Sequence, residues 1–482
     1  MNIRATIVER RAARLRAEGA ELGHRVPRAR QVPLVPFPAP PGIICEVKRR
    51  SPSRGGIAED VDIASHVTRY AEGGAGSVSI LTEEDYFHGS LADLIDAKKR
   101  FPTISFLRKD FLLSRADLEV SFRAGADAVL LIASILDRPL LEELHDSALS
   151  LGMTPLVEIH DAADLEKVRP LRPVCVGCNA RDLETFRVDL LVPVALREWI
   201  DWECTTVFES GIWGEEHAAV AASGMFDAIL VGESVIRDPT TVPRLIAGFG
   251  RTRRRFWPVI ARLIDQSRRS AAPGSAPRPL IKICGLTRES DVLLSEELGA
   301  DALGFIMCDS PRRTTAEFVA SLPQGRALRV AVVVAGDGRS IDADVARLLE
   351  DGKIDAIQLH GDERPDECYE LAFPYFKALR IRGVEDLERA GEYGSPRVLL
   401  DSFSSKARGG TGRQIDSALV EAAAERGPLW LAGGVGPDNV SEIVSRYGPE
   451  LVDASSGLES SPGQKNHASL RSYFAALAET KG

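Results

Sequence analysis

Short runs of apolar, mostly β-branched residues recur along the first half of the chain, and each is followed by a longer segment with helical spacing of its apolar residues. Such continuous apolar runs are typical of strands buried on both faces, as in a parallel sheet covered by helices. Eight such units close naturally into a (β/α)8 barrel. The expected strands are Ile43–Lys48, Ser77–Leu81, Thr103–Leu107, Ala128–Ile132, Thr154–Glu158, Val174–Gly177, Thr205–Glu209 and Ala228–Val231.

The same rhythm restarts with shorter units after an interruption. A basic run at 251–255, a short helical stretch and an Ala/Pro/Gly/Ser-rich segment around 270–277 indicate a domain junction. We therefore expect two consecutive barrels: one over 1–255 with an N-terminal helical extension, a linker over 256–278, and a second over 279–482. The second set of strands is expected at Leu280–Cys284, Ala302–Met307, Arg329–Val334, Ala356–His360, Tyr375–Leu379, Arg397–Asp401, Leu429–Ala432 and Leu451–Asp453.

Composition agrees with a globular chain of two barrels. The 482 residues are 44% hydrophobic and 27% charged, and one barrel takes about 250 residues. A net charge of −10 argues against nucleic acid or an anionic membrane as partner, and no run approaches the ~20 apolar residues of a membrane span.

The segment 1–22 alternates Arg and Glu without a signal-peptide core and predicts an amphipathic surface helix. Seven cysteines, mostly inside apolar runs, favour the cytosol, and two barrels bury enough core for a monomer.

Charged residues follow several strands of the first predicted barrel. Active sites of such barrels lie where the strands end. Two lysines facing three carboxylates there would couple their pKa values and supply a general acid and a general base. Gly211 and Gly232 open the last two loops, where barrels commonly hold phosphate, so a phosphorylated small substrate is expected. The converging charged residues are Glu46, Lys48, Lys109, Glu158 and Glu209.

These residues lie in segments that resemble indole-3-glycerol-phosphate synthases over nearly the whole first half. The resemblance implies decarboxylation and dehydration of 1-(2-carboxyphenylamino)-1-deoxyribulose 5-phosphate, closing the indole ring without a cofactor. Cys178 and Ala180 depart from the residues usual around Asn179, a change the family pattern should tolerate. The matching segments are Glu46–Ser53, Leu81–Glu83, Lys109–Phe111, Val157–Glu158, Gly177–Leu183, Glu209–Ile212 and Val231–Ser234.

The resemblance also implies roles for single residues. Lys109 would protonate the C2′ carbonyl, and Glu158 would act as the base. Lys48 would pair with the substrate carboxylate or phosphate, or share proton transfer with Lys109. Phe87 is either a wall for the anthranilate ring or plain core. The remaining substrate-binding candidates are Glu46, Ser51, Asn179, Arg181, Glu209 and Ser210, and those for phosphate are Gly211, Gly232 and Glu233; the loop from Ser51 to Gly56, with Arg54, is expected to move over the site.

The second half carries a different set of polar strand ends. Cys284 ends its first strand and Asp401 its sixth. A thiolate there could act as base while a carboxylic acid returns the proton. Metal binding by Cys284 and His360 is not expected, because no further ligands stand at suitable spacing. A second phosphate is expected to bind to accessible backbone groups at Gly433, Gly434, Ser455, Ser456 and Gly457.

Over Pro279–Tyr473 this half resembles phosphoribosylanthranilate isomerases. The resemblance implies an Amadori rearrangement of N-(5-phosphoribosyl)anthranilate, with Asp401 as general acid and Cys284 as base. It places Arg312 and His360 in the substrate pocket. Ile415 stands where the family usually has Phe, which leaves that loop open.

The two implied reactions are consecutive, so a fused pair of tryptophan-biosynthetic enzymes is the leading hypothesis. Three alternatives are a second barrel acting on a related phosphoribosyl compound, a second barrel kept as a scaffold, and a nucleic-acid binder using Arg251–Arg255. The intact polar strand ends of both halves disfavour a scaffold.

Overall fold

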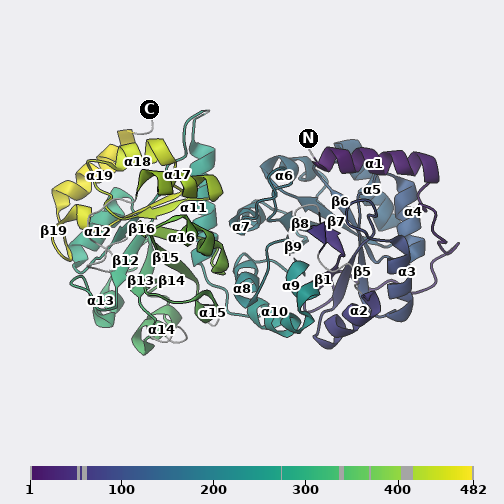
Figure 1. The fold of residues 1–482 in the computed structure, drawn as a ribbon, viewed down its shortest axis with the longest axis horizontal. Helices are drawn as coiled ribbons and strands as arrows, with labels where there is room; N and C mark the ends of the chain where they lie inside the picture. The colour runs from purple at the N-terminus through teal and green to yellow at the C-terminus, as the bar shows by residue number, and fades with distance from the viewer. Residues whose placement is uncertain are drawn as a thin grey trace. The chain divides into compact units, whose positions relative to one another are not determined.

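The computed structural model describes residues 3–51, 55–56, 62–272, 274–335, 341–368, 371–402 and 416–479. The chain forms two compact units, Met1–Arg253 and Arg254–Gly482 (Figure 1).

The first unit is a closed barrel of eight parallel strands, as expected. β1 pairs with both β4 and β10, which closes the sheet. Its strands are β1 (Ile43–Val47), β4 (Ser77–Leu81), β5 (Ser105–Lys109), β6 (Ala128–Ile132), β7 (Thr154–Ile159), β8 (Cys175–Asn179), β9 (Thr205–Glu209) and β10 (Ala228–Val231), with a small hairpin of β2 (Arg50–Ser51) and β3 (Gly55–Gly56). Its helices are α1 (Ile3–Glu18), α2 (Ile63–Glu72), α3 (Leu91–Arg100), α4 (Arg115–Ala124), α5 (Arg138–Ser150), α6 (Ala162–Val168), α7 (Leu191–Glu198), α8 (Glu215–Ser223), α9 (Glu233–Arg237) and α10 (Val242–Phe249), with a short 3₁₀ turn η1 (Pro239–Thr241).

Local sequence explains where helices begin. Ser114 caps α4 through a reciprocal capping box with Asp117, and Asp137 caps α5 from in front of a Pro in its first turn. The sequence predicts a strand at Thr103–Leu107, but β5 begins two residues later, because a turn that joins Phe101 to Ile104 follows α3. Lys109 is therefore the last residue of β5.

Apolar side chains fill the interior of the first barrel, including Leu107, Leu130, Leu156 and Val207, with Phe37 from the segment before β1. The N-terminal helix α1, which the sequence predicts to be an amphipathic surface helix, buries a charged residue on the face that meets the barrel. Arg11 is only 4% exposed, and its guanidinium lies 3.0 Å from Asp117 and 3.5 Å from Asp110. The helix is therefore fixed to α4 and to the end of β5 by buried ion pairs.

The second unit is also a closed barrel of eight parallel strands. Its strands are β11 (Leu280–Cys284), β12 (Ala302–Ile306), β13 (Leu328–Val333), β14 (Ala356–Leu359), β15 (Tyr375–Ile381), β16 (Val398–Ser402), β17 (Trp430–Ala432) and β18 (Leu451–Ala454), with a hairpin of β19 (Glu459–Ser461) and β20 (Gln464–Lys465). Its helices are α11 (Phe256–Ser270), α12 (Glu289–Leu298), α13 (Ala316–Ser321), α14 (Ala343–Glu350), α15 (Pro365–Cys368), α16 (Val384–Arg389), α17 (Ser417–Arg426), α18 (Val440–Tyr447) and α19 (His467–Glu479), with 3₁₀ turns η2 (Ala390–Glu392) and η3 (Ser456–Leu458).

Helix α11 occupies much of the stretch that the sequence assigned to a linker. Its Phe256 stacks on Phe376 with ring centroids 6.0 Å apart, and Trp257 lies 6.2 Å from Trp430. These aromatic contacts anchor α11 to β15 and β17, so the helix packs as part of the second unit.

Candidate active sites

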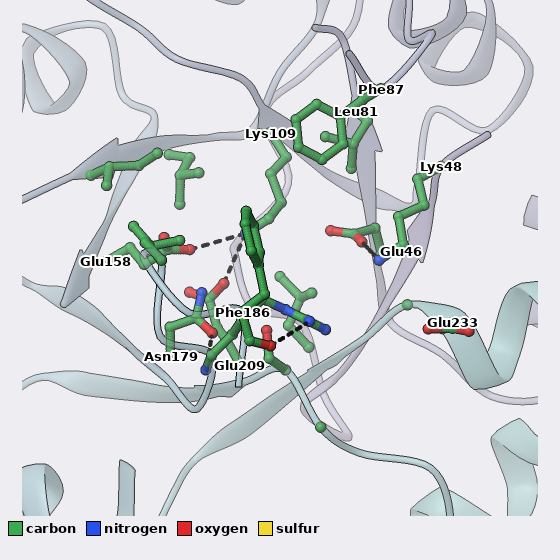
Figure 2. A pocket seen from close by; sticks show the side chains of 18 of the residues that line it. Glu46, Lys48, Leu81, Phe87, Lys109, Glu158, Asn179, Phe186, Glu209 and Glu233 are labelled. Carbon is green, nitrogen blue, oxygen red and sulfur yellow. Dashed lines mark hydrogen bonds and ion pairs between the residues drawn. The ribbon is translucent and has the colours of Figure 1, made fainter. Parts of the chain in front are cut away.

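A cavity of about 560 Å³ lies at the carboxyl ends of the strands of the first unit (Figure 2). Its polar lining comes from strands far apart in the sequence, which the barrel brings to one rim. The predicted residues that line it are Glu46, Lys48, Phe87, Lys109, Glu158, Asn179, Arg181, Glu209, Ser210, Gly211, Gly232 and Glu233. The side chain of Ser51, and Arg54 in the loop after it, lie outside the described residues.

Lys109 is held between two carboxylates. Its Nζ lies 3.1 Å from Glu158 Oε2 and 2.8 Å from Glu209 Oε2 (Figure 2). Burial would lower the pKa of Lys109, but Glu158, Glu209 and Glu46 outweigh it and raise that pKa above its ordinary value. The Lys109 side chain is therefore a charged ammonium at neutral pH.

The two carboxylates differ in charge preference. Burial opposes ionisation of Glu158, but Lys109 and His160 hold the pKa of that carboxyl well below its ordinary value. Burial, with the Glu158 charge beside it, raises the pKa of Glu209 to about 8 against the pull of Lys109. A pair whose pKa values are pushed apart in this way can supply a base and an acid at neutral pH.

A second ion pair lies at the rim, where Lys48 Nζ is 2.8 Å from Glu46 Oε1. Burial opposes ionisation of Glu46, but Lys48 and Lys109 lower the pKa of its carboxyl. A Cβ on Gly232 would stand 2.8 Å from that carboxylate and 2.9 Å from the Lys48 ammonium. Gly232 therefore keeps space open beside both groups.

The loop after β9 has an unusual backbone. Ser210 and Gly211 have φ of +70° and +77°, and for a serine this conformation costs about 1–3 kcal/mol. A Cβ on Gly211 would come within 2.5 Å of Val188. This backbone conformation places Ser210 and Gly211 at the cavity, directly after Glu209.

The apolar wall of the cavity includes the predicted Phe87. Its ring lies 6.4 Å from that of Phe111, and its backbone N–H donates to the buried Glu83. Leu81 stands next to Phe87 in the close view (Figure 2). These side chains form a surface on which a flat aromatic ring can pack.

Several lining residues were not among the predicted site residues, and four of them come from segments that the sequence did not connect with the site. Arg4 and Ile7 come from α1, and Phe186 and Trp213 come from the loops after β8 and β9. Phe186 has φ of +59°, an outlier for an aromatic residue, and it stands in front of the charged groups in Figure 2. No sequence signal marked these residues, because their place depends on how α1 docks and how one loop turns.

The second unit gathers its own polar groups at the strand ends. Cys284 is 6% exposed, and a Cβ on Gly304 would stand 2.6 Å from its Sγ and 3.0 Å from Lys282 Nζ. Lys282 Nζ in turn lies 2.6 Å from Asp453 Oδ2. Burial raises the pKa of the Cys284 thiol, and Lys282 offsets only part of that effect.

The candidate acid, Asp401, is the residue before the last of β16. Its Oδ2 lies 3.4 Å from Nε2 of the predicted His360, whose Nδ1 lies 3.0 Å from the Gln358 amide. Arg312 pairs with Glu459 at 2.8 Å, and Lys465 Nζ lies 3.0 Å from the same carboxylate. The structure thus places Arg312 near the hairpin after β18, a contact that sequence reasoning missed.

The expected second phosphate site falls on the last two loops of this barrel. Gly433 and Gly434 have φ of +89° and +67°, and Ser455 Oγ would stand 3.0 Å from a Cβ on Gly285. Ser456 and Gly457 form the turn η3. Ile415, the residue that departs from the family pattern, lies outside the described residues.

Within the described ranges, no cluster of three His, Cys, Asp or Glu residues could hold a metal ion. No helix in that part of the chain is long and apolar enough to cross a membrane.

Acid–base groups at the carboxyl ends of the strands of a (β/α)8 barrel are typical of barrel enzymes. This chain has two such barrels. Residues 11–244 match the family model for indole-3-glycerol phosphate synthase, and residues 281–476 match that for N-(5'phosphoribosyl)anthranilate (PRA) isomerase. The chain belongs to the indole-3-glycerol phosphate synthase family, and its second unit is a phosphoribosylanthranilate isomerase domain fused to it.

Three curated relatives agree with this assignment. Indole-3-glycerol phosphate synthase 1 of Streptomyces coelicolor is 40% identical, over 51% of this chain and 92% of its own length. The tryptophan biosynthesis protein TRP1 of Phytophthora nicotianae is 28% identical, over 86% of this chain and 87% of its own length. The multifunctional tryptophan biosynthesis protein of Phanerodontia chrysosporium is 29% identical over 90% of this chain, but the match spans only 63% of that longer protein.

Proposed function

We propose that the chain catalyses two consecutive reactions. The second unit isomerises N-(5-phosphoribosyl)anthranilate to 1-(2-carboxyphenylamino)-1-deoxyribulose 5-phosphate. The first unit then converts that product to indole-3-glycerol phosphate, carbon dioxide and water. The observation that carries the proposal is Lys109, charged and held between Glu158 and Glu209 in a cavity with an aromatic wall.

In the first unit, Lys109 donates its proton to the C2′ carbonyl oxygen as the aromatic carbon attacks C2′. The bond between that ring carbon and the carboxyl carbon then breaks, which releases carbon dioxide. Glu158, ionised at neutral pH, then takes the proton from C1′, and Glu209, whose pKa is raised to about 8, gives a proton to the C2′ hydroxyl so that it leaves as water. The anthranilate ring packs on Phe87, and the phosphate lies by Gly211 and Gly232.

Lys48 binds the substrate carboxylate or phosphate through an ion pair in this mechanism. Its ion pair with Glu46 sets the position of its ammonium before substrate arrives. Asn179 accepts a hydrogen bond from the Arg181 backbone at 3.0 Å, which fixes its amide toward the cavity that both residues line. The amide and the guanidinium then bind polar groups of the substrate.

In the second unit, Asp401 protonates the ribose ring oxygen, the ring opens, and the Cys284 thiolate removes the C2′ proton. The reaction moves hydrogen within one molecule and needs no external electron acceptor. Burial raises the pKa of Cys284, and the ammonium groups of Lys282 and Lys465 oppose that effect and favour the thiolate. Arg312 and His360 bind the substrate, and the backbone at 433–434 and 455–457 binds its phosphate.

The proposed partners are small phosphorylated substrates, with neither nucleic acid nor membrane, and the proposed state is a cytosolic monomer. Free thiols are usual in a reducing compartment, and the structure holds the seven cysteines as free thiols.

A reciprocal pair of variants tests the assignment. Lys109→Ala should abolish formation of indole-3-glycerol phosphate while isomerisation continues at the wild-type rate. Cys284→Ser should slow isomerisation by orders of magnitude and leave the synthase reaction intact when 1-(2-carboxyphenylamino)-1-deoxyribulose 5-phosphate is supplied. Each variant is the folding control for the other. Near-normal synthase turnover in Lys109→Ala would overturn the assignment of the first unit, and unimpaired isomerisation in Cys284→Ser would remove that thiol from the mechanism.

A further inference from the structure

His160 stands two residues after Glu158, at the end of β7, and it is not among the residues that line the cavity. Its side chain is only 8% exposed. Nε2 lies 3.1 Å from Glu158 Oε1, and Nδ1 lies 3.3 Å from Asp164 Oδ2. The imidazole is thus buried between two carboxylates, one of which is the candidate base.

The backbone fixes this arrangement. Asp161 caps α6 and accepts the Asp164 N–H at 2.8 Å, so Asp164 is fixed in the first turn of the helix. Asp164 Oδ2 also accepts the backbone N–H of His160 at 3.1 Å. The ring therefore stands where a helix cap and a strand end hold it.

The result is a row of alternating charges that ends in the cavity. It runs Asp164, His160, Glu158 and Lys109, and Lys109 also contacts Glu209. Glu158 has one oxygen by His160 and the other by Lys109, which it shares with Glu209. Among the ion pairs of the described residues, Glu158 has two cations within 4.0 Å, Lys109 and His160. Lys109 also pairs with Glu209, but His160 does not.

His160 is a cation in this setting. Burial would lower the pKa of its imidazolium, but Asp164 and Glu158 raise it to about 9. The Nε2 contact to Glu158 is short, yet the ring edge is not aligned for a well-formed hydrogen bond.

We propose that His160 is a positioning residue for Glu158: its buried imidazolium holds the carboxylate ionised and aims the second oxygen at Lys109 and the substrate. This inference rests on the proposed synthase function of the first unit. Without the charge of His160, only Lys109 and Glu209 would oppose the effect of burial, so the pKa of Glu158 would rise and the carboxylate would be protonated at a higher pH.

The pH profile of the synthase reaction tests this role. The charged groups that face His160 are Glu158 from β7, Asp164 from α6 and Asp182 from the loop after β8. An opposite charge at this distance lowers a carboxyl pKa by about 1–3 units. In His160→Gln, which keeps an amide donor but no charge, the acidic limb of kcat should move up by about 1 pH unit. At a pH on that limb kcat should fall about tenfold with KM nearly unchanged.

The matched control is His145→Gln. His145 is also a buried histidine of the first unit, on α5, with its Nδ1 3.2 Å from Asp146, and it does not line the cavity. Its substitution should leave the pH profile unchanged. A His160→Gln enzyme with an unmoved acidic limb, or the same shift in both variants, overturns the inference.

Two further measurements cover the remaining outcomes. If His160→Gln does not fold, Asp164→Asn, which keeps the acceptor for the His160 N–H, should give a smaller shift in the same direction, and no shift there overturns the inference. The ¹⁵N NMR shifts of the His160 ring can be measured without turnover, and the chain has only eight histidines to assign. These shifts should report an imidazolium up to pH 8. A neutral ring at pH 7 overturns the inference even in an active enzyme, whereas an inactive wild type contradicts the proposed function instead.

Discussion

Gly177, in the middle of β8, sets the position of the Glu209 carboxylate. A Cβ at residue 177 would stand 2.0 Å from Glu209 Oε1, whereas ordinary contact begins near 3.4 Å. In Gly177→Ala the carboxylate must therefore move by about 1.4 Å, the difference between the two distances. Its 2.8 Å ion pair with Lys109 would then be broken or redirected.

The effect should be larger on activity than on stability. The clashing atom is the end of a flexible side chain, so we expect an overpacking cost of ~1–3 kcal/mol in the free energy of unfolding. A misplacement of about 1 Å in a catalytic constellation costs about 100-fold in rate, or ~2.7 kcal/mol of activation free energy. The synthase kcat should fall by about that factor, while isomerisation by the second unit in the same sample serves as the internal control.

A double-mutant cycle assigns the loss to the clash. In a Glu209→Ala background no carboxylate remains to displace, so adding Gly177→Ala should cost nothing further in kcat. The measurement is single-turnover conversion of the carboxyphenylamino substrate, followed by indole absorbance. A Gly177→Ala enzyme within twofold of wild type, or an equal loss in both backgrounds, would refute the reasoning.

The other predictions concern the second site and the stability of the first unit. Gly304→Ala, whose Cβ would stand 2.6 Å from Cys284 Sγ, should slow isomerisation and spare the synthase, and the reverse selectivity in paired assays would contradict this. Arg11→Met should lower the free energy of unfolding of the first unit by ~3–5 kcal/mol in calorimetry, because it removes the cation paired with the buried Asp117 carboxylate, whereas Asp110 keeps its pair with Arg108; the exposed Arg10→Met, which loses a surface pair with Asp85, should change little. The pKa of His160 is raised from 6.5 to about 9, so its stabilisation is full below pH 6.5 and disappears as pH rises through 9. The stability difference between wild type and His160→Gln should shrink over that range, and a constant difference would contradict the ion pair.

The barrel architecture and the central charged cluster follow from sequence. Parallel strands that close a barrel must bring their carboxyl ends together, so Lys109, Glu158 and Glu209 had to meet once the strands were recognised. Even the two-residue error in β5 did not hide Lys109, because it still stood at the end of an apolar run.

The parts that could not be predicted depend on long-range docking or on electrostatics after burial. The ion pair of Arg11 joins residues 106 positions apart, and nothing in the alternating charges of α1 reveals it. The φ of Phe186 is set by the turn of its loop. His160 follows a strand as many solvated histidines do, and its charge is evident only from the two carboxylates that enclose it.

The most direct test of the two-reaction account is the purified chain supplied with N-(5-phosphoribosyl)anthranilate in the presence of a metal chelator. The account predicts that the carboxyphenylamino intermediate forms first and that indole-3-glycerol phosphate then accumulates at its expense. Absence of both products, in protein shown to be folded, would contradict the account.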